Sequence, residues 1–325
     1  MTVPGPAVLP LLEDGALRLE AARELVPLLR RWLPLLPYPE SLAENPAAAR
    51  IRVSRESSPL SHSRTLALSH SPSLRLGTAD LWVDGDAVAL RGGAGCVGEG
   101  DLARRSIELA APAEGGDAEA VSWDLYSMCT LSSALLLGRM RRALTHAAAV
   151  VARDGGCWLL VGDTHAGKST TCANLLNAGW GFVTDDHGIL FRDAGGRLSV
   201  EGWPRPFHLD EGWEAGAPVH RRGETDPHAR WPGQWRRAAP LAGLLFPRVR
   251  AERPTELAPL APSEALSGLL RQSPWLLADR AAAPAVLELL RAACEAPVFS
   301  LRLGLDTYRD TDKLLACLAP LSGAS

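Results

Sequence analysis

The sequence is poor in lysine. Only two of its 34 lysine and arginine residues are lysines, Lys168 and Lys313, and the net charge is -3. A chain without an excess of positive charge has no overall field that attracts nucleic acid or an anionic membrane. We therefore expect neither a nucleic-acid partner nor a membrane partner. The abundance of arginine, alanine and proline is typical of a GC-rich coding sequence, so most arginines need no functional explanation.

The chain also lacks a paired-cysteine motif and a long apolar run, and we expect no leader sequence. Its six cysteines form no Cys-x-x-Cys pair, which argues against common zinc and redox motifs and favours buried, reduced thiols. The N-terminus has no basic segment before an apolar one. The most apolar early stretch, residues 25–36, is interrupted by arginine and proline and is too short to span a bilayer. These features predict a cytoplasmic location.

One of the two lysines lies in a glycine-rich motif. Residues 162–170 read Gly-Asp-Thr-His-Ala-Gly-Lys-Ser-Thr, a complete G-x-x-x-x-G-K-[ST] phosphate-binding loop. The apolar run 157–161 predicts a buried strand before it, and residues 169–177 predict a helix after it, capped by Gly179. A strand, the loop and a helix in this order are the context that the motif requires. The alternative is a glycine turn that carries Lys-Ser by chance.

The residue types of the motif suit a triphosphate bound together with Mg²⁺. Lys168 would bridge the β- and γ-phosphates, and Ser169 would ligate Mg²⁺. A compact ammonium on a thin stem reaches into a ring of backbone N–H groups more readily than a planar guanidinium does. The expected nucleotide-binding residues are Gly162, Asp163, Thr164, His165, Ala166, Gly167, Lys168, Ser169 and Thr170.

Two adjacent carboxylates follow the next expected strand, residues 181–184. Adjacent aspartates at a strand end commonly start a turn, but after a phosphate loop and its helix they favour function. One carboxylate would hold Mg²⁺, and the other would accept the proton of an attacking hydroxyl. The sequence does not assign these two roles between Asp185 and Asp186, so both are candidate catalytic residues and candidate metal ligands.

Three further side chains are candidates by residue type. His146 begins an expected strand at 146–152 and either assists catalysis or is a core or turn residue with satisfied hydrogen bonds. His187 follows the aspartates, and simple strand alternation would place it on the far face. Arg205, within the aromatic segment 203–208, would stabilise charge on a transferred phosphoryl group. Packed tryptophans with solvated arginines are the plain alternative for that segment. The spacing of the histidines and aspartates matches no zinc site.

The pattern along the chain predicts two domains, divided near residue 120. Residues 1–120 are expected to form a smaller α+β domain that either recognises substrate or completes the fold. Its expected elements are an amphipathic helix at 16–30 that Pro27 kinks or shortens, strands within 51–109 such as 64–68 and 79–83, a hairpin turn at Asp84-Gly85 and a flexible loop at 111–119.

Residues 121–325 are expected to form an α/β nucleotide-binding domain with a mixed sheet. A loop is expected at 209–240, which is rich in Arg, Trp, Gly and Pro. The Asp154-Gly-Gly sequence predicts a turn. The expected helices are 123–144, 169–177, 263–272, 284–294 and 310–318, and the expected strands are 146–152, 157–161, 181–184, 188–191, 198–200, 244–247 and 298–303.

The segment from Thr145 to His187 resembles the catalytic core of the HPr kinase/phosphorylase family, in the phosphoenolpyruvate carboxykinase-like class. That family shows a histidine-containing strand, a hairpin, Gly-Asp-Ser-Gly-x-Gly-Lys-Ser, a helix ending in glycine, and a strand closing on Asp-Asp. A looser resemblance continues to the C-terminus, where residues 203–209 and 245–247 are similar to segments of kinase relatives. The matching core positions are His146, 154–156, 162–164, 167–169, Gly179 and 183–186.

The resemblance implies an HPr-kinase-like fold and ATP- and Mg²⁺-dependent phosphorylation of a hydroxyl. His146 together with an aspartate would help to activate that hydroxyl. Relatives act on a serine of a carrier protein, on the C-terminal serine of a peptide, or on small molecules such as free serine. The implied partner is therefore a hydroxyl-bearing peptide, protein or small molecule.

Two features depart from the family pattern. His165 stands where the family has a second glycine, which bears on the geometry of the loop and the pose of the nucleotide. The chain also lacks the Glu-x-Arg-Gly loop that HPr kinases carry after the core. The resemblance therefore does not imply phosphorylase activity or HPr as the acceptor.

Three interpretations stay open at the level of sequence. The first is a kinase, a phosphotransferase with an alcohol acceptor, which is favoured by carboxylates expected beside the γ-phosphate. The second is a nucleotide-binding regulator with weak or no ATPase activity. The third is a degenerate fold retained for protein interaction. The sequence identifies neither the acceptor nor whether the chain forms a homo-oligomer.

Overall fold

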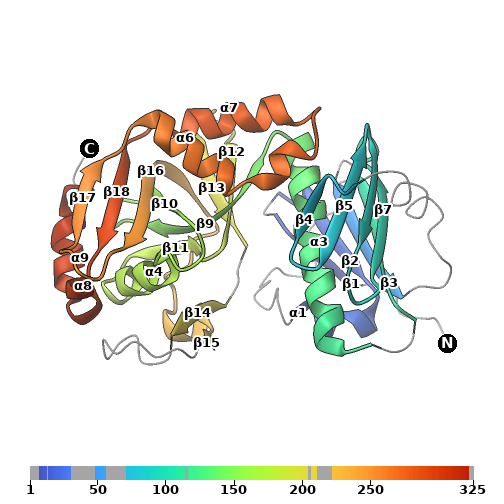
Figure 1. Ribbon diagram of the computed structural model, residues 1–325, viewed down its shortest axis with the longest axis horizontal. Helices are drawn as coiled ribbons and strands as arrows, with labels where there is room; N and C mark the ends of the chain where they lie inside the picture. Colours follow the sequence, from blue (N-terminus) through green and yellow to red (C-terminus); the bar gives the residue numbers. More distant parts are fainter. Residues whose placement is uncertain are drawn as a thin grey trace. The chain divides into compact units, whose positions relative to one another are not determined.

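The computed structural model describes residues 7–12, 14–30, 48–55, 71–113, 116–203, 206–210 and 222–321 (Figure 1). Contacts within the chain divide it into two compact units. The first comprises residues 1–141 and 274–286, and the second comprises residues 142–273 and 287–325. Residue 120, where the sequence predicted a domain boundary, lies inside the first of these units, near the start of helix α3 (Ala118–Arg139).

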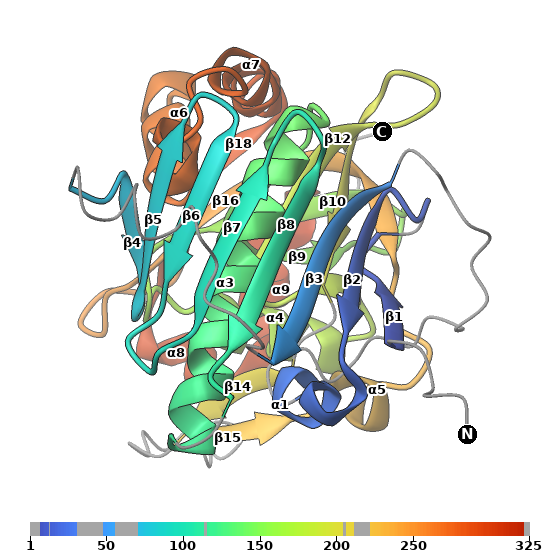
Figure 2. The same ribbon diagram turned by 90° about the vertical axis from the view of Figure 1, so that its right-hand side faces the viewer.

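An eight-stranded mixed sheet forms most of the first unit (Figure 2). Strand β3 pairs in parallel with β2 and β8, whereas the other neighbours pair antiparallel. In spatial order the strands are β1 (Ala7–Pro10), β2 (Leu17–Ala21), β3 (Ala49–Arg55), β8 (Ser106–Ala111), β7 (Val97–Asp101), β6 (Ala87–Arg91), β5 (Ala79–Asp84) and β4 (Leu74–Leu76).

Helix α3 covers one face of this sheet (Figure 2). Along β3 the apolar side chains of residues 49, 51 and 53 are buried and the arginines between them are exposed, as expected for a sheet covered on one face. The Asp117 side chain caps the helix by accepting a hydrogen bond from the Glu119 N–H at 3.1 Å. Within the described residues, α3 is the one helix long and apolar enough to cross a membrane, and 89% of its apolar window is buried inside the protein.

The predicted helix at 16–30 is wrong in its first part. Residues Leu17–Ala21 form strand β2, and only the short helices η1 (Arg23–Leu25) and α1 (Val26–Arg30) follow. The buried residues of β2 alternate with partly exposed ones, so the period is two rather than 3.6. Pro27 lies in the first turn of α1, the part of a helix that tolerates proline.

Other expectations for the first unit have mixed outcomes. Strands β5 and β6 form the predicted hairpin, with Gly85 at φ 59° in its turn. Helix α3 begins and ends before the predicted bounds 123–144, because residues 143 and 144 already belong to the next strand. The predicted strand at 64–68 and residues 31–36 of the early apolar stretch lie outside the described residues.

The second unit contains a second eight-stranded mixed sheet. Strand β10 pairs with both β9 and β16, so that β10, β9, β12, β13 and β16 form a closed circuit of pairings. Strand β16 pairs in parallel with β10 and β18, and the remaining neighbours pair antiparallel. The strands are β9 (Ala143–Val151), β10 (Cys157–Val161), β11 (Gly181–Thr184), β12 (His187–Arg192), β13 (Leu198–Gly202), β16 (Ala238–Val249), β17 (Glu256–Pro259) and β18 (Val298–Leu303).

Helices pack on both faces of β10, β16 and β18 (Figure 1). Helix α4 (Lys168–Asn177) and helix α9 (Thr311–Leu318) share a buried cluster with Leu160, Leu245 and Leu301. Helix α6 (Pro262–Arg271) packs on the opposite face, where Gly268 faces the ring of Phe246. The mixed α/β architecture with a mixed sheet agrees with the fold class expected from the sequence.

Several elements of the second unit match their predicted bounds. Strands β10, β11 and β18 occupy the expected residues, and α4, α6, α9 and α7 (Ala283–Ala293) begin within one residue of expectation. The predicted cap of α4 is confirmed. Gly179, at φ 86°, donates its N–H to the carbonyl of Leu176 at 2.9 Å, and the Trp180 N–H donates to Leu175 at 3.0 Å.

The predicted loop at 209–240 is wrong in part. Strand β14 (Phe207–Asp210) pairs with β15 (Arg222–Thr225), helix α5 (Pro227–Arg230) follows, and β16 already begins at residue 238. The proline and tryptophan residues that suggested a loop instead begin α5 and pack into the core, as Trp231 does. Residues 211–221 lie outside the described part of the chain.

Helix α3 carries one buried carboxylate that is fully hydrogen-bonded to its neighbours, Asp124. Asp124 is 1% exposed and accepts hydrogen bonds from the Thr78 hydroxyl at 2.6 Å and from the N–H groups of Gly93 and Ala94 at 3.1 and 2.6 Å. Asp124→Ala is expected to lower the free energy of unfolding by about 3 kcal/mol, because it leaves three donors without their acceptor. Urea denaturation followed by circular dichroism measures the change. The exposed Asp84→Ala control should stay within about 0.5 kcal/mol, and equal losses would contradict the role of Asp124.

Candidate functional site

The sheet of the second unit brings together chain segments that are distant in sequence. Strand β9 runs antiparallel to β10 and β11, with Val161 opposite Ala147 and Thr184 opposite Ala149. The carboxyl ends of β10 and β11 therefore lie beside the start of β9, where His146 is located. The loop after β10 and the two aspartates after β11 consequently lie near this histidine.

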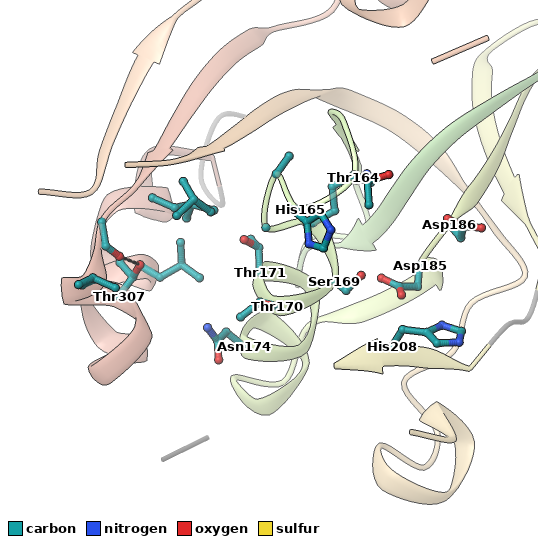
Figure 3. A pocket seen from close by; sticks show the side chains of 18 of the residues that line it. Thr164, His165, Ser169, Thr170, Thr171, Asn174, Asp185, Asp186, His208 and Thr307 are labelled. Carbon is teal, nitrogen blue, oxygen red and sulfur yellow. Dashed lines mark hydrogen bonds between the residues drawn. The ribbon is translucent and has the colours of Figure 1, made fainter. Parts of the chain in front are cut away.

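A cavity of about 370 Å³ lies at this end of the strands. Its volume is within the range of small-molecule sites in proteins. In Figure 3 the first turns of α4 lie between Asp185, Asp186 and His208 on one side and Thr307 on the other. The lining residues are His146, Thr164, His165, Ala166, Gly167, Lys168, Ser169, Thr170, Thr171, Asn174, Asp185, Asp186, His208, Val249, Leu303, Gly304, Leu305, Thr307 and Leu314.

Most residues singled out in the sequence line this cavity. Gly162 and Asp163 belong to the same loop but do not line it. Arg205, the fourth predicted catalytic residue, lies outside the described residues.

The Lys168 ammonium lies inside its own loop. The residue is only 7% exposed, and its Nζ donates hydrogen bonds to the carbonyls of Gly162 at 2.6 Å and Asp163 at 3.1 Å. Helix α4 begins at Lys168, and its N-cap, Gly167, has no side chain that could cap the first turn. The N–H groups of a first helical turn have no acceptor within the helix, so this end of α4 presents hydrogen-bond donors and the positive end of the helix dipole.

Two loop residues have left-handed backbone conformations. Gly167 has φ 96°, and a Cβ at this position would lie 2.7 Å from Leu303 Cδ1. His165 has φ 66°, a conformation that favours glycine and costs another residue about 1 kcal/mol. The HPr kinase family has glycine where this chain has His165, and the backbone conformation of His165 is one that glycine adopts readily. Turns of mixed handedness direct successive N–H groups into a concave anion site.

Asp186 lies between two histidines. His146 Nε2 is 3.0 Å from Asp186 Oδ1, and His187 Nδ1 is 3.0 Å from Asp186 Oδ2. Each carboxylate oxygen thus lies within 3.0 Å of one ring nitrogen, and the side chain, 28% exposed, still reaches the cavity. The expected turning away of His187 is therefore wrong. Register explains this, because His187 on β12 lies directly opposite His146 on β9.

Thr184, the last residue of β11, organises the turn that carries both aspartates. Its hydroxyl donates to the Trp203 carbonyl at 2.9 Å and accepts from the N–H groups of Asp186 and His187 at 3.4 and 3.3 Å. Asp185 is 5% exposed and also lines the cavity. The turn thus places one nearly buried and one partly exposed carboxylate at the same wall.

The oxygen-rich wall suits Mg²⁺ better than a softer metal. Ser169, Asp185 and Asp186 all line the cavity and offer the hard oxygen donors that Mg²⁺ prefers. Among the described residues, no group of three or more His, Cys, Asp or Glu side chains forms an all-protein metal site. Mg²⁺ commonly binds through one or two carboxylates together with substrate phosphates, so the residues present fit this ion.

Sequence reasoning missed several residues of this site. Gln272, at the end of α6, contacts both His146 and Asp163. His208 and Asn174 line the cavity as well, and Val249, Leu303, Leu305 and Leu314 form an apolar part of its wall. His208 ends the aromatic segment 203–208 that the sequence singled out, but the other residues belong to no recognisable motif.

The cysteines take no part in the chemistry of the cavity. All six are free thiols, five of them are buried, and none lines the cavity. Cys172, on α4, has a pKa well above its usual value, because burial and then the nearby charge of Asp185 disfavour the thiolate. Burial likewise raises the pKa of Cys157. Neither thiol is therefore a nucleophile near neutral pH.

Comparison with known proteins adds a partial likeness. No family model matches the chain, and no curated protein sequence matches it. Among solved structures, the chain is similar to the HPr(Ser) kinase/phosphatase from Coxiella burnetii, at 11% sequence identity and a TM-score of 0.32. The match covers 56% of this chain and 99% of that chain. Because a TM-score this low carries no weight for activity, we base the functional assignment on the residues and contacts of this chain.

The geometry of the loop predicts different effects at its two left-handed residues. Gly167→Ala is expected to lower the free energy of unfolding by about 1–3 kcal/mol, because a side chain is strained at this φ and its Cβ would crowd Leu303. His165→Gly should change it by less than about 1 kcal/mol, since glycine adopts this φ freely. Chemical denaturation of both variants measures the difference. Tolerance of alanine at 167 would show that the loop has another backbone conformation.

Proposed function

We propose that the second unit binds ATP with Mg²⁺ and transfers the γ-phosphoryl group to a hydroxyl of a peptide, protein or small molecule. One observation carries this proposal: a single cavity is lined both by Lys168 in its glycine-rich loop and by Asp186 between two histidines. Phosphoryl transfer needs charge stabilisation at the phosphates and a group that takes the proton of the attacking hydroxyl. Both requirements can be met here within one cavity.

The loop and the start of α4 would hold the phosphates. Lys168 Nζ already lies within the loop, and phosphate oxygens would replace the carbonyls of Gly162 and Asp163 as its acceptors. The first-turn N–H groups of α4 would donate to the same oxygens. Residues 162–170 are therefore proposed as the phosphate-binding segment.

The opposite part of the cavity has the composition of a nucleobase site. Small-molecule sites combine apolar walls with a few polar groups that fix orientation. The Asn174 amide and the Thr307 hydroxyl are such groups, and apolar side chains from β16, β18, α8 (Leu305–Arg309) and α9 surround them. The proposed base-contacting residues are Asn174, Val249, Leu303, Leu305, Thr307 and Leu314.

Ser169 and Asp185 would hold Mg²⁺, with Asp186 available to it directly or through water. Asp185 is the more buried of the two carboxylates, which suits a group that keeps its charge beside a cation. The bound ion would supply charge neutralisation to the phosphate oxygens. This division leaves Asp186 free to act on the acceptor.

Asp186 would take the proton of the acceptor hydroxyl. The hydroxyl oxygen forms a bond to the γ-phosphorus as the bond from that phosphorus to the bridging oxygen breaks, and ADP leaves. The proton passes to the Asp186 carboxylate, whose Oδ1 lies 3.0 Å from His146 Nε2. His146 and His187 orient the carboxylate during this step.

The acceptor class and location follow from the same chemistry. A serine hydroxyl is the simplest acceptor for an aspartate base, and Lys168 is the one lysine or arginine among the described residues that line the cavity. ATP as substrate and six free thiols suit a cytoplasmic protein without a membrane partner.

The two lysines of the chain provide a matched test of nucleotide binding. Lys168→Met keeps an unbranched side chain that is one atom shorter and removes its charge, so ATP should bind about 10- to 100-fold more weakly in isothermal titration calorimetry. Lys313 is 58% exposed in a surface pair with Asp310, and Lys313→Met should bind as the wild type does. Equal affinities for all three proteins would refute a phosphate site at Lys168.

Asp186→Asn tests the transfer step. Asparagine has a similar shape but cannot take a proton, so the rate of phosphorylated-product formation should fall by about 10²- to 10⁴-fold. Mass spectrometry after incubation with ATP, Mg²⁺ and free serine, serine-terminated peptides or a small carrier protein measures this rate. The exposed Asp84→Asn variant is the control. Undiminished transfer by Asp186→Asn would contradict its role as base, and ATP binding by the wild type without any product would instead identify a nucleotide-binding regulator.

A further inference from the structure

Gln272 joins two parts of the site that lie on different elements. It caps α6 through its N–H, which donates to Gly268 at 3.3 Å, and its carbonyl accepts from the His146 N–H at 2.8 Å. The residue is 7% exposed. Its backbone is therefore fixed to α6 on one side and to the start of β9 on the other.

The side chain of Gln272 bridges the loop and the histidine. Its Nε2 donates to Asp163 Oδ1 at 2.7 Å, and its Oε1 lies 3.1 Å from His146 Nδ1. A continuous path of contacts thus runs from Asp163 through Gln272 and His146 to Asp186 and ends at His187.

The chemistry of an amide sets the direction of these hydrogen bonds. A carboxylate only accepts, so the NH₂ group of Gln272 must face Asp163. The opposite amide orientation would place two acceptors against each other at that contact. The carbonyl oxygen Oε1 then faces His146, and because it only accepts, His146 Nδ1 must carry a hydrogen. The Asp186 carboxylate also only accepts, so the 3.0 Å contact from His146 Nε2 to Asp186 Oδ1 is a hydrogen bond when Nε2 carries a hydrogen as well.

We propose that Gln272 is a positioning residue that holds His146 with a proton on Nδ1 and ties that ring to the phosphate loop through Asp163. This role deepens the proposed function and rests on it. Asp163 also accepts from Lys168 through its backbone carbonyl, so the loop residue that contacts the lysine is the one that Gln272 holds. One side chain thus links the phosphate loop to the histidine–aspartate pair that the strand pairing brings beside it.

The two ends of Gln272 can be separated by substitution. Gln272→Met removes both hydrogen bonds at similar volume. Gln272→Glu keeps an acceptor toward His146 but places a carboxylate against Asp163. Adding Asp163→Asn to Gln272→Glu restores a donor–acceptor pair with its direction reversed, because the asparagine amide can donate to the glutamate. Gln234→Met is the control for the chemical change, since Gln234 lies outside the cavity lining.

The first readout is the protonation pattern of His146 in the protein without nucleotide. Long-range ¹H–¹⁵N spectra of histidine-labelled protein distinguish a protonated from an unprotonated Nδ1. We expect a protonated Nδ1 in the wild type, in Gln272→Glu and in Gln234→Met, and a mixture in Gln272→Met. An unprotonated His146 Nδ1 in the wild type overturns the proposal without use of any variant.

The second readout is steady-state kinetics of phosphoryl transfer. Gln272→Met should lower kcat about tenfold, because the ring no longer holds Asp186 in one orientation. Gln272→Glu should mainly raise the KM for ATP, and the added Asp163→Asn should restore it. Unchanged kcat and KM in Gln272→Met, or failure of the double variant to improve on Gln272→Glu, would contradict the positioning role.

The two readouts separate this inference from the proposed function. If ATP does not bind and no product forms, but Nδ1 of His146 is protonated in the wild type and only partly in Gln272→Met, the proposed function fails and the contact of Gln272 stands. If the wild type transfers phosphate and Nδ1 is unprotonated, the function stands and the positioning role fails.

Discussion

The site depends on one carboxylate held between two histidines. Asp186 contacts His146 and His187 at 3.0 Å through its two oxygens, and those histidines are direct partners in the register of β9 and β12. Residues directly opposite on neighbouring strands present their side chains on the same face of the sheet. The sheet register therefore places both rings on one face before any ligand binds, and the aspartate that precedes His187 lies between them. Preorganisation of this kind costs no rearrangement at the time of reaction.

Strand β9 is the element that makes this arrangement possible. Its first residues pair with β12 and its later residues pair with β10 and β11, so one strand organises three segments of the chain. Strands β10 and β11 both run antiparallel to β9. Their carboxyl ends, where the phosphate loop and the Asp pair follow, therefore lie near His146. Helix α4 then starts directly from the loop, with its positive end at the cavity. The apolar wall from β16, β18 and α9 completes the cavity, which under the proposed function would hold a base at one end and phosphates at the other.

The parts that were predicted from sequence are those with local signals. Strands β10 and β18 are short apolar runs bounded by turn residues, and the glycine-rich loop and Asp pair are contiguous motifs. Residues 17–21 were misread because a mixed apolar pattern over a short window fits both a helix and a strand until pairing with β3 decides it. Gln272 could not be found, since its two contacts are made across more than 100 residues of sequence. The orientation of His187 depends on the register between β12 and β9. The left-handed backbone conformation of His165 depends on the conformation of the whole loop.

The most direct measurement is a crystal structure with Mg²⁺ and a non-hydrolysable ATP analogue. The proposed function predicts the triphosphate along the loop, with Lys168 Nζ transferred from the Gly162 and Asp163 carbonyls to phosphate oxygens. It also predicts the γ-phosphate facing Asp186, and the base against the wall that contains Asn174 and Leu303. A nucleotide bound outside this cavity, or one whose γ-phosphate points away from Asp186, would contradict the assignment of a phosphoryl-transfer site.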